Sequence, residues 1–388
     1  MVDVMIEMFE KIQRRKELYL PEKKRLVFDS IELKNRAVLF VGARGVGKTT
    51  YLLSRAAERD FLYVSADHAL VTESSLWEIG DAAFGRGYEG IVLDEVHRAK
   101  DWGVHLKSLV DSFPGKTVWA SGSSSILLKM GVADLSRRFS RVYLPLLSFR
   151  EYLFLAGGHE FPVFDPFSGA EAGDVIRGIV RDVNVQKEFR DYLSGGLRPI
   201  FLDWDYQEQL GNVIEKILYF DIPYLVPQVT DNHYRLMHAV LGHMALSKIP
   251  SINIESMCKK WGLSKAKLYQ LLDAMHHVGL IRIIYREGDT AAFSKGAKIY
   301  LFDPSMYHVL GGTTGNVREA FVAHALVNGE TNIAACRNEE NGDFVFGDLT
   351  LEIGGKSKRR KQADFVLRDD MELPSGKILP LWTLGFRY

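Results

Sequence analysis

The chain has 388 residues, enough for two to three domains at about 150 residues each. Lys plus Arg and Asp plus Glu both number 49, so the formal net charge is zero. This balance excludes a strongly basic coat and confines any nucleic-acid contact to a local patch. Hydrophobic residues (47 %) and charged residues (25 %) are close to globular averages, which argues against intrinsic disorder.

The cysteines, the first residues and the apolar stretches together indicate the cellular compartment. Cys258 and Cys336 are too few for a disulfide framework and too far apart for a zinc knuckle. The first residues carry acids where a signal peptide has Lys or Arg. The longest apolar stretch, residues 142–157, is interrupted by Arg150 and Glu151 and cannot span a bilayer. We therefore expect a cytoplasmic protein without a membrane partner.

The N-terminal part of the chain has the pattern of a parallel sheet. Residues 1–35 are charged and helical in pattern. From residue 37 to 145, short apolar runs alternate with segments long enough to be helices; the runs are AVLFVG, FLYVSAD, GIVLDEV, TVWASG and RVYLPLL. Such spacing predicts βαβ units and a sheet buried on both faces. We predict an α/β domain over residues 1–147.

A phosphate-binding loop follows the first of these strands. Residues 42–49, GARGVGKT, match G-x-x-x-x-G-K-[ST] at every fixed position, between a strand and a helix. The glycines let successive N–H groups point at phosphate oxygens, Lys48 would reach the β- and γ-phosphates, and the Thr49 hydroxyl would bind Mg²⁺. A glycine-rich turn without a ligand is the alternative. The predicted nucleotide-binding residues are Gly42, Ala43, Arg44, Gly45, Val46, Gly47, Lys48, Thr49 and Thr50.

A second motif supports the first independently. The strand IVL ends in Asp94 and Glu95, where charge is costly unless it has a use. Asp94 is suited to hold Mg²⁺. Glu95, expected to point the opposite way along the strand, is suited to deprotonate an attacking water. An acid pair that caps a helix starting at Val96 is the alternative.

With the strand FLYVSAD between these motifs and Glu95 after Asp94, the chain resembles the additional-strand, catalytic-glutamate division of P-loop proteins, which includes AAA-type ATPases. The resemblance implies ATP as the nucleotide, because the P-loop itself reads only phosphates. It also implies a polar sensor of the γ-phosphate after the strand TVWASG. Ser121 and Ser123 are both candidates, and a helix N-cap is the alternative for each.

An arginine pair precedes the fifth strand. In AAA-type proteins an arginine at this place can act as a finger on the nucleotide of a neighbouring subunit. Arg137 and Arg138 match the position, and we take Arg138 as the catalytic candidate. Surface salt bridges are the alternative for the pair. A finger role would imply self-association.

The remaining segments resemble one group of archaeal and bacterial AAA-type ATPases, from about residue 25 to the end. The segments LSRRFSRVYLPLLSFREYL and YLSGGLRP carry the resemblance. It implies a helical lid at 148–232, a winged helix at 233–295 and a PD-(D/E)xK nuclease-like domain at 296–388. The predicted fold class is therefore α/β: a P-loop (AAA-type) parallel sheet, a helical lid, a winged helix and an α/β nuclease-like C-terminal domain.

The apolar spacing of residues 233–290 agrees with a winged helix, because it predicts helices followed by a strand pair. The recognition helix would begin after an N-cap at Ser264. It would present Ser264, Lys265, Lys267 and Gln270 outward, residue types that contact phosphates and bases. DNA is thus one candidate partner. A winged helix that only packs or contacts protein is the alternative.

The tail has nuclease-like residues in a departing pattern. Glu319, Asp343, Glu352 and Lys356 occur in the order that PD-(D/E)xK nucleases use to hold Mg²⁺ and polarise water. Three residues separate Glu352 from Lys356 instead of one, and Gly354 and Gly355 imply a turn there. We therefore expect a degenerate scaffold without cleavage. The basic run 356–361 is either a phosphate-binding loop or a solvated one.

Taken in sequence, these motifs favour an ATP-binding and hydrolysing switch with Mg²⁺ as its metal. It would couple nucleotide state to the winged helix and the nuclease-like domain. A Mg²⁺-dependent DNA nuclease regulated by ATP is one alternative. A DNA-binding regulator with little ATPase activity is another.

Overall fold

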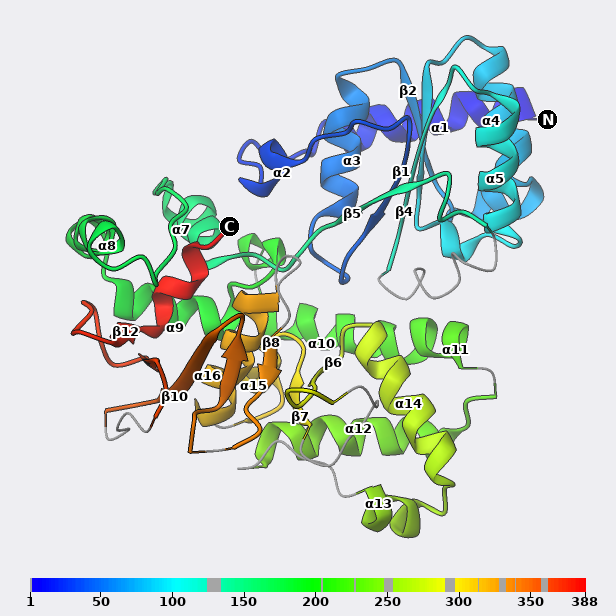
Figure 1. The fold of residues 1–388 in the computed structure, drawn as a ribbon. Helices are drawn as coiled ribbons and strands as arrows, with labels where there is room; N and C mark the ends of the chain where they lie inside the picture. Colours follow the sequence, from blue (N-terminus) through cyan, green and yellow to red (C-terminus); the bar gives the residue numbers. More distant parts are fainter. Residues whose placement is uncertain are drawn as a thin grey trace. The chain divides into compact units, whose positions relative to one another are not determined.

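The computed structural model describes residues 2–123, 134–203, 205–226, 228–247, 254–289, 297–312, 314–327, 333–338, 340–356 and 362–388. The chain forms two compact units, Met1–Pro145 and Leu146–Tyr388 (Figure 1). Within the described ranges, no helix combines the length and the apolar character needed to cross a membrane.

The first unit contains a five-stranded, all-parallel sheet with the strand order β2-β3-β4-β1-β5. Its strands are β1 (Ala37–Val41), β2 (Phe61–Ser65), β3 (Gly90–Asp94), β4 (Thr117–Gly122) and β5 (Ser140–Tyr143). Its described helices are α1 (Val2–Glu17), α2 (Val27–Ser30), α3 (Lys48–Ala57), η1 (Ala69–Glu73), α4 (Leu76–Gly85), η2 (Val96–Arg98) and α5 (Trp102–Ser112). The predicted parallel sheet is confirmed.

Helices cover both faces of this sheet, so its strands are apolar at nearly every position. Side chains of α1, α4 and α5 pack with Leu39, Leu93 and Ala120 into one core. On the other face α3 packs its Tyr51 against Phe40, with ring centroids 5.2 Å apart. Because side chains alternate along a strand, the residues next to Leu93 and Ala120 point towards α3. This alternation decides the composition of the site described below.

The N-terminal helix α1 covers the edge strand β2. The side chain of Gln13 accepts a hydrogen bond from the backbone N–H of Tyr63 (2.8 Å) and donates to the carbonyl of Phe61 (3.2 Å). These backbone groups belong to the outer edge of the sheet, which would otherwise remain unpaired. The helix therefore completes the hydrogen bonding of β2.

The second unit begins with helices and continues into a small hairpin. The helices are α7 (Phe149–Gly157), α8 (Ala170–Asp182), α9 (Val185–Gly195), η4 (Pro199–Leu202), α10 (Tyr206–Lys216), η5 (Ile217–Asp221), α11 (Ile222–Leu225), α12 (Asp231–Leu246), α13 (Ile254–Trp261) and α14 (Lys265–His277). The antiparallel hairpin consists of β6 (Ile281–Ile284) and β7 (Lys298–Leu301). The domain boundary predicted between residues 232 and 233 falls inside α12. The boundary predicted between 295 and 296 lies outside the described residues.

A second five-stranded sheet, of mixed direction, forms the C-terminal part with the order β12-β11-β10-β9-β8. Its elements are α15 (Met306–Val309), α16 (Thr314–Val327), β8 (Ile333–Ala335), β9 (Phe344–Phe346), β10 (Leu349–Gly354), β11 (Phe365–Arg368), β12 (Ile378–Pro380) and η6 (Leu381–Phe386). Strands β8, β9 and β10 pair antiparallel, whereas β10, β11 and β12 pair parallel.

A buried ion pair ties the GGLRP segment to the end of the hairpin. Arg198 Nε donates to Asp303 Oδ2 at 2.7 Å, and both side chains are essentially inaccessible. The second oxygen of Asp303 accepts from the backbone N–H of Ser305 (2.9 Å). A buried pair is tolerated only when such additional hydrogen bonds satisfy it. The segment after α9 is thus fixed to the loop after β7.

Candidate nucleotide-binding site

The phosphate-binding loop connects β1 to α3, as predicted. Gly45 (φ 77°) and Gly47 (φ 94°) have left-handed backbone conformations that glycine adopts without strain. A Cβ at Gly42 would collide with the carbonyl oxygen of Leu144, which follows β5. The loop therefore needs its glycines for the turn and for close approach to the neighbouring strand.

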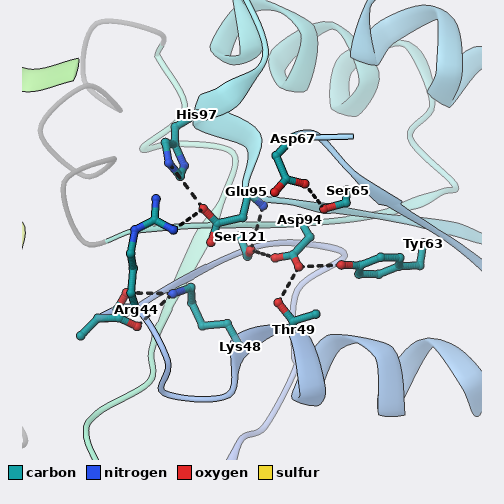
Figure 2. A network of polar contacts seen from close by, with 12 residues as sticks. Arg44, Lys48, Thr49, Tyr63, Ser65, Asp67, Asp94, Glu95, His97 and Ser121 are labelled. Carbon is teal, nitrogen blue, oxygen red and sulfur yellow. Dashed lines mark hydrogen bonds and ion pairs between the residues drawn. The ribbon is translucent and has the colours of Figure 1, made fainter. Parts of the chain in front are cut away.

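Lys48 begins α3 and folds over the loop. Its side chain is buried, and Nζ donates to the carbonyls of Gly42 (2.9 Å) and Ala43 (3.1 Å) (Figure 2). Both acceptors are neutral carbonyl oxygens of the loop itself. The ammonium thus lies inside the loop, at the N-terminus of a helix, where an anion is favoured.

Asp94, at the end of β3, is the centre of a hydrogen-bond network. Hydroxyl groups of Thr49 (2.6 Å) and Tyr63 (2.7 Å) donate to its Oδ2, and the Ser121 hydroxyl donates to its Oδ1 (Figure 2). The Asp94 side chain is buried. Charge-assisted hydrogen bonds of this kind are the means by which a buried carboxylate is stabilised. The network joins α3, β2, β3 and β4 at one edge of the sheet.

Strand alternation explains why these residues meet. Leu93 pairs with Ala120 in adjacent parallel strands, and both face the core with α4 and α5. Asp94 and Ser121, each one residue further, therefore turn towards α3, where Thr49 lies. Tyr63 shares this face because it pairs with Val92.

Glu95 is oriented differently from the expectation. Strand β3 ends at Asp94, and Glu95 has a left-handed backbone (φ 54°) at the start of η2, so strand alternation does not set its direction. Its Oε2 lies 3.7 Å from Arg44 Nη1 and 3.5 Å from His97 Nε2. Its backbone N–H donates to the Ser121 hydroxyl at 3.2 Å. The carboxylate thus faces the loop across the same site.

The two sensor candidates differ in what they touch. Ser121, at the end of β4, bonds to Asp94 and to the backbone of Glu95. Ser123 is also buried, one residue beyond the strand. Ser121 therefore links the side chain of Asp94 to the backbone of Glu95. Neither serine caps a described helix.

Arg137 and Arg138 differ in solvent exposure and in their partners. Arg138 donates to Asp111 (2.7 and 2.9 Å) and to Asp134 (3.0 Å), both in the same unit. The hydrogen bond from Arg138 holds the pKa of Asp111 below its usual value. Arg137 is exposed. The structure thus gives Arg138 intrachain partners and leaves Arg137 on the surface.

The oxygen atoms of Thr49 and Asp94 fit a magnesium ion. Mg²⁺ prefers a few protein oxygens plus waters and substrate phosphates in octahedral geometry. A threonine hydroxyl and a carboxylate 2.6 Å apart, beside a loop that binds phosphates, provide such a set. A metal held this way needs no cluster of three acidic or imidazole ligands, and none occurs among the described residues.

Sequence reasoning missed three supporting residues. Tyr63 bonds to Asp94, and Lys16 Nζ lies 3.4 Å from the Tyr63 hydroxyl. Arg25 is buried and donates to the carbonyls of Val46 (2.9 Å) and Pro145 (2.7 Å), which supports the loop from outside. The β2 alternation was a signal for Tyr63; the two basic residues come from a segment with only a helical, charged pattern.

The nuclease-like residues are only partly brought together. Lys298 Nζ contacts both Glu319 (3.3 Å) and Asp343 (3.1 Å). Glu352 is buried in β10. Lys356 is exposed and lines a cavity of about 770 Å³ with Arg318, Asp369 and residues of α9. The cation beside the acids is thus Lys298, which the sequence pattern did not single out.

The DNA-contact candidates lie at the start of α14 or beyond the described residues. Ser264 is the N-cap, as predicted, and accepts from the backbone N–H of Lys267 at 3.2 Å. Lys265 Nζ pairs with Glu255 at 2.8 Å, and Lys267 Nζ donates to Gln270 at 3.2 Å. Residues 357–361 of the basic run lie outside the described residues.

Comparison with known proteins agrees with this geometry. Residues 34–153 match a family described as an AAA domain. No curated protein matches the chain. Similar solved structures include a Walker-type ATPase of Pyrococcus abyssi (14 % identity, TM-score 0.39). The alignment covers 72 % of this chain and 91 % of the Pyrococcus chain.

Two further structures are similar at low TM-scores. One is from a study of katanin self-assembly (21 % identity, 40 % of this chain and 58 % of that one, TM-score 0.26). The other is a variant of Thermotoga maritima RuvB (14 % identity, 76 % and 91 %, TM-score 0.28). At such scores the assignment comes from the matched family and from the loop, strand order and acidic pair of this chain. The family match therefore supports an AAA-type P-loop domain over residues 34–153.

Proposed function

We propose that the protein is an ATP-binding and hydrolysing switch that couples nucleotide state to a winged helix and a degenerate nuclease-like domain. The observation that carries the proposal is the convergence of Lys48, Thr49 and Asp94 at one edge of the parallel sheet. A cation, a hydroxyl and a carboxylate at a phosphate-binding loop form the set that nucleoside triphosphate chemistry requires. ATP, rather than another triphosphate, is proposed from the AAA domain.

The proposed roles follow from position. The loop N–H groups and Lys48 bind and orient the β- and γ-phosphates, which replace the loop carbonyls as partners of the ammonium. Thr49 and Asp94 would hold Mg²⁺, which would offset the negative charge of the phosphates. Glu95 accepts the proton of the attacking water, and Ser121 fixes Asp94 and the Glu95 backbone together.

The contact between Arg44 and Glu95 suits a site that responds to nucleotide. Arg44 belongs to the loop and Glu95 is the proposed base, so a bound γ-phosphate would compete with Glu95 for the guanidinium. Release of Glu95 would then accompany binding. This supports a switch in which the acidic pair and the loop change partners together.

We propose that α12, α13, α14 and the β6–β7 hairpin form the winged helix. Three helices followed by an antiparallel strand pair support this assignment, as does the N-cap at Ser264. DNA remains a proposed partner through Lys265, Lys267 and Gln270. The pairing of Lys265 with Glu255 means that DNA must compete with an existing ion pair.

We further propose that residues 296–388 are a nuclease-like scaffold without catalysis. The position of Lys298 between Glu319 and Asp343 supports this, because an ammonium already lies within ion-pair distance of both acids and offsets part of their charge. Lys356 is exposed and lines a cavity with Arg318 and Asp369, whereas the cation in contact with both acids is Lys298, which supports it as well. We also propose that the chain self-associates and that Arg137 or Arg138 then acts on the nucleotide of a neighbouring subunit. Turnover per chain that rises with protein concentration is the expected result.

Purified protein tests the proposal directly. ATP turnover is measured with and without DNA, alongside DNA integrity in Mg²⁺. The expected result is ATP hydrolysis that requires Mg²⁺ and Lys48, with intact DNA. Absence of nucleotide binding would remove the ATPase assignment, and DNA cleavage that requires Asp343 would replace the switch by a regulated nuclease.

A further inference from the structure

The acidic pair in the second unit has a cation of its own. Lys298 begins β7, Glu319 lies on α16 and Asp343 directly precedes β9. The Lys298 ammonium lies 3.3 Å from Glu319 Oε2 and 3.1 Å from Asp343 Oδ1. It also lies 4.9 Å from the ring centroid of Phe344. The amine on β7 thus contacts one carboxylate from α16, and a carboxylate and an aromatic face from the start of β9.

Both acids also accept a hydrogen bond from a group other than Lys298. The Tyr300 hydroxyl donates to Glu319 Oε2, and the backbone N–H of Ile353 donates to Asp343 Oδ2 at 2.9 Å. Tyr300 lies two residues after Lys298, so both side chains leave the same face of β7. The arrangement is therefore built by β7 and is not an accidental contact of one long side chain.

The electrostatics agree with a permanent ammonium. Burial acts to lower the pKa of Lys298, but the charges of Glu319 and Asp343 outweigh it, so the pKa is raised. A lysine that stays charged in a partly buried place requires carboxylates close by. Removal of the amine would leave two carboxylates facing each other without a cation.

We infer that Lys298 occupies, with its own ammonium, the cation position between Glu319 and Asp343 that a divalent metal takes in a catalytic acidic pair. The inference rests on the proposed nuclease-like scaffold and gives it a physical cause. In place of binding a metal, Glu319 binds the hairpin β6–β7 to α16, and Asp343 binds it to the C-terminal sheet.

The test is a Mn²⁺ titration of the full chain without nucleotide. Electron paramagnetic resonance measures the free Mn²⁺, and the bound Mn²⁺ is obtained by difference. Wild-type protein is expected to show no site dependent on Asp343. The Lys298→Ala variant opens the position and is expected to gain such a site, with a Kd on the order of 10⁻³ M or tighter. The double variant Lys298→Ala/Asp343→Asn should lose it again.

Lys298→Arg controls for the charge, and a variant of an exposed lysine controls for nonspecific effects on folding. Lys298→Arg keeps the cation and should neither bind Mn²⁺ nor lose stability strongly. Lys298→Ala should lower the melting temperature by on the order of 5 °C. Lys187→Ala removes an exposed lysine of the same unit that pairs with Glu188 and Asp191, and it should leave melting and Mn²⁺ binding unchanged.

The outcomes separate the inference from the ATPase proposal. Wild-type protein that binds Mn²⁺ through Asp343 overturns the inference, as does DNA cleavage that requires both Lys298 and Asp343. A folded Lys298→Ala that gains no site and melts as wild type also overturns it. If Lys298→Ala does not fold, comparison of wild type with Asp343→Asn still decides. ATP turnover, measured in parallel, tests the ATPase proposal separately, because its predicted catalytic residues all lie in the first unit.

Discussion

The Tyr63 hydroxyl donates a hydrogen bond of 2.7 Å to the Asp94 carboxylate, on the same oxygen that Thr49 contacts. Burial, and then the charge of Asp94, raise the pKa of Tyr63 well above its ordinary value. The phenol therefore stays protonated and always donates. Since Asp94 and Thr49 are the proposed Mg²⁺ ligands, Tyr63 is a positioning residue for that pair.

Tyr63→Phe is expected to raise the Mg²⁺ concentration needed for half-maximal ATP turnover about 10-fold. Loss of a hydrogen bond to a metal ligand typically lowers metal affinity 10- to 100-fold. The measurement is the Mg²⁺ concentration that gives half-maximal ATP turnover, together with nucleotide affinity in EDTA, which should not change. Tyr88→Phe removes a comparable hydrogen bond to Glu10 (2.8 Å) and is the matched control. Equal effects of both variants would reduce Tyr63 to a structural role.

Lys48→Ala is expected to abolish nucleotide binding or weaken it strongly, because it removes the cation that lies inside the loop. Affinity for a fluorescent ATP analogue measures the effect. Lys34→Ala, which removes an exposed lysine paired with Glu32 in the same unit, should bind as wild type. Unchanged affinity of Lys48→Ala would sink the assignment of the loop.

Glu95→Gln is expected to retain ATP while turnover falls by at least ~100-fold, the scale for loss of a general base. Single-turnover hydrolysis separates this from slow product release. The matched control is Glu58→Gln, which alters an exposed acid paired with Arg55. Turnover at the wild-type rate would make Glu95 a structural acid that only pairs with Arg44 and His97.

Arg138→Ala is expected to lower turnover only at protein concentrations at which the chain self-associates, since a finger acts on another subunit. Asp111→Asn provides the contrast, because it breaks the intrachain contact but keeps Arg138. If both variants lower turnover equally in dilute monomer, Arg138 is a structural bridge. Arg137→Ala, tested alongside, shows whether the exposed arginine supplies the finger instead.

The second unit should lose stability in acid through His276. Burial, then the charges of His277 and Arg282, lower the pKa of His276 from 6.5 to about 4. The unfolded chain therefore binds a proton that the folded chain does not, so the free energy of unfolding is fully retained above about pH 6.5 and declines as the pH falls to about 4.

His276→Asn should reduce this decline, because asparagine does not titrate and keeps an acceptor for the Ile283 N–H. Chemical denaturation at several pH values measures it. His238→Asn changes a more exposed histidine and should leave the slope as in wild type. An identical slope in His276→Asn would mean that other groups cause the acid sensitivity.

The sequence was sufficient for those parts of the site that lie within one element. The loop from Gly42 to Thr49 is local, so its glycines, its lysine and its place before α3 could all be predicted. Asp94 followed from the same logic, because it ends an apolar strand. Tyr63 could not be paired with it, since that requires the register of β2 against β3, which depends on tertiary packing.

The errors and omissions share this cause. Glu95 was expected to follow strand alternation, but the chain leaves the strand one residue earlier and adopts a left-handed conformation. Lys298 meets Glu319 and Asp343 only through the packing of the hairpin on α16, and no spacing in the sequence signals it. Helix starts with local side-chain caps, such as Ser264 before α14, were by contrast predictable.

The hydrogen bonds of Gln13 to the backbone of β2 bear on whether this edge strand can pair with a strand of another chain. They satisfy the Phe61 carbonyl and the Tyr63 N–H, the groups on which a foreign strand would otherwise extend the sheet. A chain that loses α1 by proteolysis would expose an apolar, unprotected template, Phe61 to Ser65, to its neighbours. The N-terminal helix therefore guards against aggregation as well as lying beside the tyrosine of the nucleotide site.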